Sequence, residues 1–191
     1  MSKKVGILGG TFNPPHMGHL IIANEVLHAL NLDEIRFMPN ATPPHKKKDE
    51  HVSEANRLKM VKLAIKDMPK MNVETIELER GGTSYTFDTM ELLQEREPST
   101  TFFFIIGGDQ VEYLPKWHRV EELVKKVQIV GVPRPNTTFE TAYPIIKLDI
   151  PQIELSSTIV RNRLQNGKTT KFLLPESVKD FIQREKLYEE R

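Results

Sequence analysis

The sequence contains no cysteine among its 191 residues. This absence excludes a disulfide framework, a thiolate metal site and a cysteine nucleophile, and it is typical of an intracellular protein. Long apolar runs are missing too: no stretch approaches the roughly 18 apolar residues of a membrane-spanning helix, and no signal peptide precedes the first apolar segment. We therefore expect a cytoplasmic protein that neither is secreted nor spans a membrane.

The chain also has little excess charge of either sign. Its 27 lysines and arginines face 26 aspartates and glutamates, which gives a formal net charge of +1. This balance provides no sequence-wide basic signal, so nucleic acid is not expected as a partner. No repeat, linker or break in composition divides the chain, and we expect a single domain over residues 1–191. The sequence leaves open whether the protein forms a homo-oligomer.

Apolar and amphipathic segments alternate along the chain and predict an α/β fold. The expected strands are residues 5–8, 34–39, 72–78, 101–106, 128–132 and 145–150, and the expected helices are 20–30, 53–68, 90–96, 120–126, one beginning after Leu155, and 175–187. Residues 101–106 are apolar at consecutive positions, which predicts a strand buried on both faces at the centre of the sheet. Alternating strands and helices favour a doubly wound parallel sheet with ligands at the strands' carboxyl ends.

The most informative stretch is residues 5–19, Val-Gly-Ile-Leu-Gly-Gly-Thr-Phe-Asn-Pro-Pro-His-Met-Gly-His. The apolar run ends in Gly9 and Gly10, and a helix is expected to begin near Gly18. The helix start offers free N–H groups and a positive dipole end, and His16 and His19 lie three residues apart, so the segment predicts a polyphosphate site. The glycine spacing fits neither the dinucleotide G-x-G-x-x-G nor the Walker pattern. For two histidines alone, a strand-to-helix loop with surface histidines would be the simpler interpretation.

Two loops suggest a second ligand. Lys46, in the loop after residues 34–39, is placed to contact an anion, although adjacent lysines more often form a solvated charge run. The segment before residues 90–96 has two interpretations. Either Thr86 with Thr89, or Ser84 with Asp88, caps the helix, or the exposed N–H groups at the helix start bind an anion such as a carboxylate.

Two features follow the central strand. Gly107, Gly108 and Asp109 suit contact with a ribose or a metal-bound phosphate, with an Asp helix cap as the alternative. Trp117 is the chain's only tryptophan and lies beside proline and charged residues, so stacking on a ligand ring and a structural role are both open.

The segment from Leu155 to Arg161 is the second strong signal. Ser156 or Ser157 can cap the helix that begins there, and Arg161 lies within about one turn. Hydroxyls, free N–H groups and a guanidinium together suit the terminal phosphates of a triphosphate, whereas a plain cap with a solvated arginine is the alternative.

These two segments carry a family resemblance. Residues 11–19 resemble the T/GxFDPxHxGH motif of the HIGH-type nucleotidyltransferases: Thr11, Phe12, Pro14, His16, Gly18 and His19 match, and Asn13 replaces the usual Asp. Residues 155–161 resemble the second signature, ISSTxIR, with Leu155 and Val160 replacing isoleucines. The combined pattern and length are most similar to the bacterial nicotinate mononucleotide adenylyltransferases, over nearly the whole chain.

The resemblance implies a Rossmann-like nucleotidyltransferase fold and an enzyme of NAD biosynthesis. Such an enzyme joins ATP to nicotinate mononucleotide and yields nicotinate adenine dinucleotide and pyrophosphate, with Mg²⁺ carried by the ATP phosphates rather than by a protein metal site. The implied ATP-binding residues are Gly9, Gly10, Thr11, Phe12, His16, Gly18, His19, Gly107, Asp109, Ser156, Ser157, Thr158 and Arg161, of which His16, His19 and Arg161 are catalytic. The implied acceptor-binding residues are Thr11, Asn40, Lys46, Thr86, Trp117 and His118, where many relatives have tyrosine instead of His118.

No segment resembles a covalent nucleophile with its base, which favours direct in-line attack on the ATP α-phosphate. Two alternatives stay open. A phosphopantetheine adenylyltransferase shares the first motif but needs no pyridine stack, so Thr86 and Trp117 speak against it. A nucleotide-binding regulator without catalysis is suggested by Asn13 alone.

Overall fold

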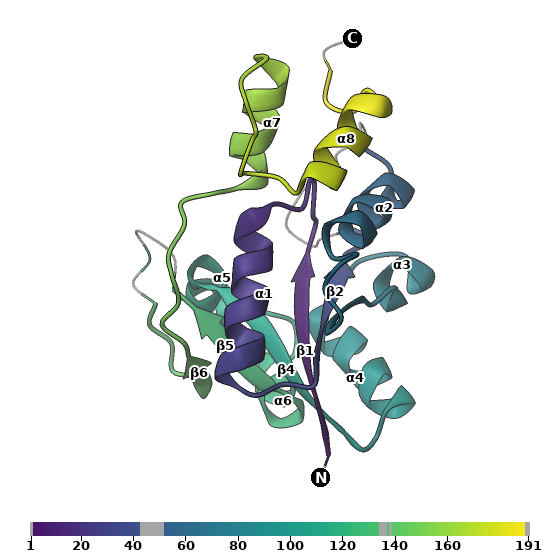
Figure 1. Cartoon of the computed structure of the whole chain (residues 1–191). Helices are drawn as coiled ribbons and strands as arrows, with labels where there is room; N and C mark the ends of the chain where they lie inside the picture. Colours follow the sequence, from purple (N-terminus) through teal and green to yellow (C-terminus); the bar gives the residue numbers. More distant parts are fainter. Residues whose placement is uncertain (1, 43–51, 134–136, 138, 190–191) are drawn as a thin grey trace.

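The computed structural model describes residues 2–42, 52–133, 137 and 139–189. In this part of the chain, one parallel sheet has the strand order β3-β2-β1-β4-β5-β6. The strands are β1 (Lys3–Gly10), β2 (Glu34–Pro39), β3 (Met71–Val73), β4 (Thr100–Gly107), β5 (Gln128–Val132) and β6 (Ile145–Lys147). The order reverses between β1 and β4, so the sheet is doubly wound, and β4 lies at its centre as predicted (Figure 1).

Helices cover both faces of the sheet. They are α1 (Met17–Ala29), α2 (Glu54–Ala64), α3 (Ile76–Arg80), α4 (Thr86–Arg96), α5 (Gly108–Tyr113), the 3-10 helix η1 (Leu114–Lys116), α6 (Val120–Lys126), α7 (Ser157–Gln165) and α8 (Glu176–Arg184). One core joins α1, α2 and α8 to the sheet, and a second core joins α4, α5 and α6 to its other face. Phe102 and Phe104 of β4 enter the second core, and Phe103 and Ile105 enter the first. This alternation explains why the central strand is apolar at consecutive positions over residues 102–106.

One strand prediction was wrong. Residues 72–78 were expected to be extended, but β3 ends at Val73 and α3 begins at Ile76. The carboxylate of Glu74 accepts a hydrogen bond from the N–H of Ile76 at 3.2 Å and so stabilises the start of the helix. The same carboxylate pairs with Arg36 of β2 and Arg96 of α4.

Several elements end earlier in the chain than predicted. Ser53 caps α2 as predicted, accepting from the N–H of Asn56 at 3.2 Å, but this helix ends at Ala64 rather than at residue 68. Likewise β6 ends at Lys147 and α8 ends at Arg184. The bounds of β2, α6 and β5 agree with the prediction.

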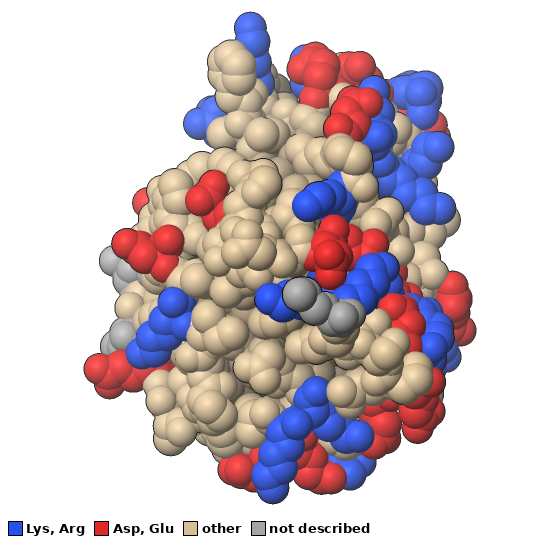
Figure 2. All heavy atoms as spheres, turned by 60° about the horizontal axis from the view of Figure 1, so that its bottom comes forward, with Lys and Arg blue, Asp and Glu red and all other residues tan. Residues whose placement is uncertain are grey.

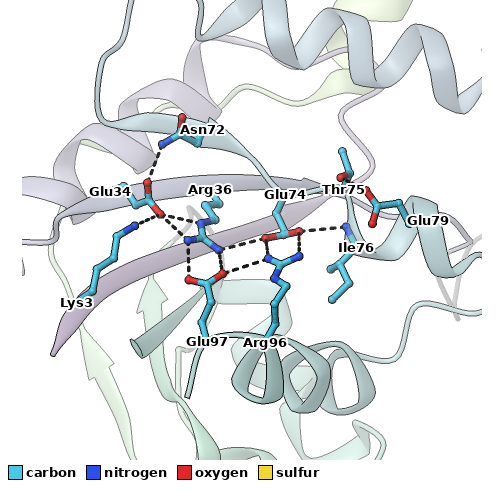
Figure 3. A network of polar contacts seen from close by, with 10 residues as sticks. All are labelled: Lys3, Glu34, Arg36, Asn72, Glu74, Thr75, Ile76, Glu79, Arg96 and Glu97. Carbon is cyan, nitrogen blue, oxygen red and sulfur yellow. Dashed lines mark hydrogen bonds and ion pairs between the residues drawn. The ribbon is translucent and has the colours of Figure 1, made fainter. Parts of the chain in front are cut away.

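An ion-pair network lies beside the amino-terminal half of β2 (Figure 3). We use this name for Lys3, Glu34, Arg36, Glu74, Arg96 and Glu97. Arg36 forms two parallel hydrogen bonds to Glu97, at 2.5 and 2.8 Å, and also donates to Glu34 at 2.8 Å. Because its members come from β1, β2, the end of β3 and the end of α4, the network fixes these elements to one another.

Charges of both signs are interspersed over the face of the molecule shown in Figure 2, beside a broad uncharged area. None of the described helices is both long enough and apolar enough to cross a membrane.

Candidate active site

A cleft of about 1330 Å³ lies at the carboxyl ends of the strands, where the strand order reverses. Most of the predicted site residues line it: Gly9, Gly10, Thr11, Phe12, His16, His19, Asn40, Thr86, Gly107, Asp109, Trp117, His118, Ser156, Ser157, Thr158 and Arg161. Gly18 lies outside this lining, and Lys46 lies outside the described residues. At Gly18 an added Cβ would meet the His16 ring at 3.1 Å, so this glycine makes room for the imidazole.

The two histidines of the first motif are stacked. Their ring centres lie 3.7 Å apart with 24° between the planes, and Phe12 contacts the His19 ring edge-on at 5.0 Å. The backbone N–H of His16 donates to Nδ1 of His19 at 3.1 Å. Because Nδ1 accepts, a neutral His19 carries its proton on Nε2, which can then donate to a phosphate oxygen.

The start of α1 is less open than expected. The N–H of Met17 donates to the carbonyl of Leu173 at 2.9 Å, and the N–H of His19 donates to the carbonyl of His16 at 3.0 Å. These groups are therefore engaged within the fold. The histidine side chains, rather than a row of free N–H groups, dominate this end of the cleft.

The two signature segments contact each other although they are about 140 residues apart in sequence. Ser157 donates to the carbonyl of Pro14 at 2.8 Å, and Arg161 donates to the carbonyl of Asn13 at 2.7 Å. Ser156 caps α7 as predicted, accepting from the N–H of Ile159 at 3.3 Å. The second signature is thus placed directly beside the first.

Asn13 is buried, with 4% of its surface exposed. Its side-chain Oδ1 accepts a hydrogen bond from the hydroxyl of Tyr188, near the end of the chain. A carboxamide oxygen serves this contact as a carboxylate oxygen would, so the replacement of the family's usual Asp keeps a polar acceptor at this point.

At the other end of the cleft, neither predicted capping pair forms. The Thr89 hydroxyl shares its one proton between Glu77 at 3.0 Å and the carbonyl of Tyr85 at 3.1 Å, while the Ser84 hydroxyl accepts from the N–H of Ala41 at 3.2 Å. No described side chain caps the start of α4. The first N–H groups of this helix therefore face the cleft without a side-chain partner, which suits an anion.

Aromatic side chains form the wall beside this helix start. Trp117 is partly buried and packs edge-on against Phe104, with ring centres 5.9 Å apart. The rings of Tyr85 and His118 lie 4.8 Å apart. Asp109 is exposed in the first turn of α5, and Gly107 is the residue before that helix, so the predicted glycine turn is a helix start.

Two buried ionisable residues of the cleft were not predicted. Arg57 donates to the carbonyl of Thr11 at 2.9 Å and to the carbonyl of Asn40 at 2.7 Å, and burial lowers its pKa. Glu77 is 4% exposed, and burial raises the pKa of its carboxyl. The position of Arg57 on the inward face of α2, beside Val61 at the next turn, was the available sequence signal.

Within the described residues, no group of three or more His, Asp and Glu side chains is arranged to hold a metal ion. Taken together, the lining residues of the cleft combine cations, hydroxyls and helix starts with an aromatic wall. This set suits phosphates at one end and a flat, anionic ring at the other.

Comparisons with known proteins agree with this geometry. The cytidylyltransferase-like family model matches residues 7–163. The nicotinate-nucleotide adenylyltransferase of Bacillus subtilis (strain 168) is 50% identical over 187 residues, which cover 98% of this chain and 99% of that relative. The chain belongs to the nicotinate-nucleotide adenylyltransferase family.

Solved structures have the same fold as this chain. The nicotinic acid mononucleotide adenylyltransferase of Plasmodium falciparum complexed with NaAD has a TM-score of 0.81 at 21% identity, covering 97% of each chain. The same protein complexed with APC has a TM-score of 0.80 at 20% identity, again covering 97% of each chain. The Rossmann-like nucleotidyltransferase fold expected from the sequence is confirmed.

Proposed function

We propose that this chain transfers the adenylyl group of ATP to nicotinate mononucleotide, giving nicotinate adenine dinucleotide and pyrophosphate in NAD biosynthesis. The observation that carries the proposal is the contact of the two signature segments in one cleft whose far end has an uncapped helix start and a tryptophan. The name and the 50% identity of the Bacillus subtilis relative support it. The proposed site of action is the cytoplasm, where ATP is available.

In this proposal the ATP phosphates bind between the first motif and α7. His16, His19 and Arg161 supply donors and positive charge, and Ser156, Ser157 and Thr158 supply hydroxyls or N–H groups. Gly9, Gly10, Thr11 and Phe12 line the nucleotide's path, and Gly107 and Asp109 contact its adenosine part. The Mg²⁺ ion is held by the ATP phosphates, where it neutralises part of their charge.

The acceptor occupies the other end of the cleft. Thr11 and Asn40 lie at its phosphate, the first N–H groups of α4 near Thr86 receive the nicotinate carboxylate, and Trp117 stacks on the pyridine ring. We propose that the N–H beside His118 contributes to the same carboxylate. Donors of this kind favour a carboxylate over an amide, whose own N–H₂ group would oppose them.

The chemical step is an in-line displacement. An oxygen of the acceptor phosphate forms a bond to the α-phosphorus of ATP, the bond from that phosphorus to the bridging oxygen breaks, and pyrophosphate leaves with the electron pair. His19 and Arg161 stabilise the charge that grows on the phosphate oxygens, and the two ends of the cleft hold the reactants in line.

The test is pyrophosphate release with ATP and Mg²⁺, comparing nicotinate mononucleotide, nicotinamide mononucleotide and phosphopantetheine as acceptors. A strong preference for nicotinate mononucleotide supports the proposal. A preference for phosphopantetheine would contradict the roles given to Thr86 and Trp117. ATP binding without turnover for any acceptor would instead favour the non-catalytic regulator, against which the contact of Asn13 with Tyr188 speaks, because it keeps the motif in place.

A further inference from the structure

Two arginines from different helices hold the first motif. Arg161 of α7 donates to the carbonyl of Asn13 at 2.7 Å, and Arg57 of α2 donates to the carbonyl of Thr11 at 2.9 Å. The two carbonyls are two residues apart in the chain, so both arginines act on the same short turn. Arg161 belongs to the second signature, whereas Arg57 lies outside both signatures.

The two arginines differ in what else they contact. The second hydrogen bond of Arg161 goes to Thr158 in its own helix, at 3.2 Å. The second hydrogen bond of Arg57 goes to the carbonyl of Asn40, at 2.7 Å, in the loop that follows β2. Asn40 in turn donates from Nδ2 to the Thr11 hydroxyl at 3.4 Å. Arg57 therefore joins the ends of β1 and β2 to each other.

Burial makes this junction rigid. Arg57 is 5% exposed, whereas Arg161 is partly exposed beside the cleft. A planar guanidinium presents its N–H groups in a fixed fork, so two carbonyls bonded to the two ends of the fork are held at a set separation. A lysine ammonium keeps the charge but offers no such fork.

Resting on the proposed function, we propose that Arg57 is a positioning residue for the acceptor: it fixes Thr11 and Asn40 where they receive the acceptor's phosphate. One contact of Arg57 falls on Asn40, which is assigned to the acceptor alone, and the other falls on Thr11, which is assigned to both substrates; neither falls on the histidines or on α7. Loss of Arg57 therefore weakens acceptor binding more than ATP binding. It also leaves the histidine stack in place, so turnover at saturating acceptor falls less than the acceptor's apparent affinity.

The experiment compares Arg57→Lys and Arg57→Met with the wild-type chain. Nicotinate mononucleotide and ATP are titrated separately by calorimetry, and KM for each substrate and kcat are measured from pyrophosphate release. We expect Arg57→Met to raise the Kd and KM for nicotinate mononucleotide about tenfold or more, with the ATP values within about twofold. Arg57→Lys should weaken acceptor binding by at least about threefold, since it keeps the charge and loses the fork.

Two controls separate positioning from folding. Thermal unfolding establishes that each variant is folded at the assay temperature, and Arg36→Lys, an arginine replacement in the ion-pair network outside the cleft, should leave both KM values unchanged. If Arg57→Met does not fold, the folded Arg57→Lys chain decides the question through its KM values.

Three results would overturn the proposal: equal losses for both substrates, wild-type affinities in Arg57→Lys alongside a loss in Arg57→Met, or acceptor binding unchanged in both. The first would make Arg57 a general scaffold residue, and the second would make its charge, not its geometry, the cause. Failure of the proposed function is a separate outcome, because the wild-type chain would then release no pyrophosphate with nicotinate mononucleotide.

Discussion

Arginines in the ion-pair network and arginines in the cleft are held by different partners. In the network, Arg36 and Arg96 bind the carboxylates of Glu34, Glu74 and Glu97 (Figure 3). In the cleft, the hydrogen bonds of Arg57 and Arg161 go to backbone carbonyls and to a threonine hydroxyl. A carbonyl is neutral, so it orients a guanidinium without cancelling its charge. The cations of the network stabilise the fold, whereas in the cleft Arg161 lines the ligand space and Arg57 joins two strand ends.

The pKa values follow the same division. The hydrogen bond from Arg36 lowers the pKa of the Glu97 carboxyl, so this group stays charged and paired. In the cleft, burial lowers the pKa of Arg57 and raises that of Glu77. Pairing favours the charged form of Glu97 in the network, whereas burial disfavours the charged forms of Arg57 and Glu77 in the cleft. Substitutions in the two regions should therefore separate stability from activity.

The largest effect is expected from His19→Ala. Its contact with a phosphate should strengthen as charge moves onto the phosphates in the transition state, so turnover should fall about 10²- to 10³-fold while ATP binding changes far less. A small loss of stability is also expected, because the ring packs on Phe12 and His16 and accepts the backbone N–H of His16. The measurement is kcat together with the Kd for ATP and a denaturation curve, and equal losses of turnover and ATP affinity would contradict this role.

Arg36→Met should have the opposite effect: it should lower stability and leave activity unchanged. Arg36 is the cation shared by three carboxylates of the network, and its loss leaves Glu34 with Lys3 only and Glu74 and Glu97 with Arg96 only, which costs about 2–3 kcal/mol of unfolding free energy. At temperatures where the variant is folded, kcat and both KM values should match the wild type. Urea denaturation gives the stability, and a loss of activity in the folded variant would show that the two regions are coupled.

The sequence predicted more of the fold than of the hydrogen bonds among the site residues. Segments such as 34–39 and 128–132 were found because each is a short apolar run bounded by polar residues, so local pattern and tertiary structure agree. Residues 74–76 were misassigned because Glu74 takes its partners from β2 and α4, which no local window contains. The lesson is that long-range ion pairs can override a weak strand pattern at a sheet edge.

At the site, residues of both signature segments line one cleft, as the sequence predicted from a helix start combined with cations or hydroxyls in each. The capping pairs at 84–89 were wrong, because Ser84 and Thr89 bond to Ala41 and Glu77 instead. Arg57 was missed because it lies in a helix whose other residues suggest ordinary packing. Its function as a contact between two strand ends depends on tertiary geometry that sequence spacing does not encode.

Trp117→Ala tests whether the acceptor and ATP depend on different parts of the cleft. If the indole stacks on the acceptor ring, its loss should raise the acceptor's KM by about tenfold, since ring stacking contributes roughly 1–3 kcal/mol, and leave ATP affinity nearly unchanged. Because the indole also packs on Phe104, a small loss of stability is expected. A collapse of ATP affinity would instead make Trp117 a structural residue.

The smallest effect is expected from Glu77→Gln and Glu97→Gln, whose stability relative to the wild type should change with pH in opposite directions. Burial raises the pKa of Glu77, so its folded form binds the proton more tightly than the unfolded form does. The stability that this carboxyl contributes is present below its unfolded pKa and is lost as the pH rises through the raised value. Glutamine does not titrate, so Glu77→Gln should become more stable relative to the wild type as the pH rises.

Glu97→Gln should show the reverse trend, because Arg36 lowers the pKa of Glu97. Its contribution is present above the unfolded pKa and is lost as the pH falls through the lowered value, so the deficit of this variant should shrink in acid. Urea denaturation of both variants and the wild type across the acid and neutral range measures the two trends in one series. Parallel trends would mean that cleft and network carboxyls share one environment, and the division between the regions would fail.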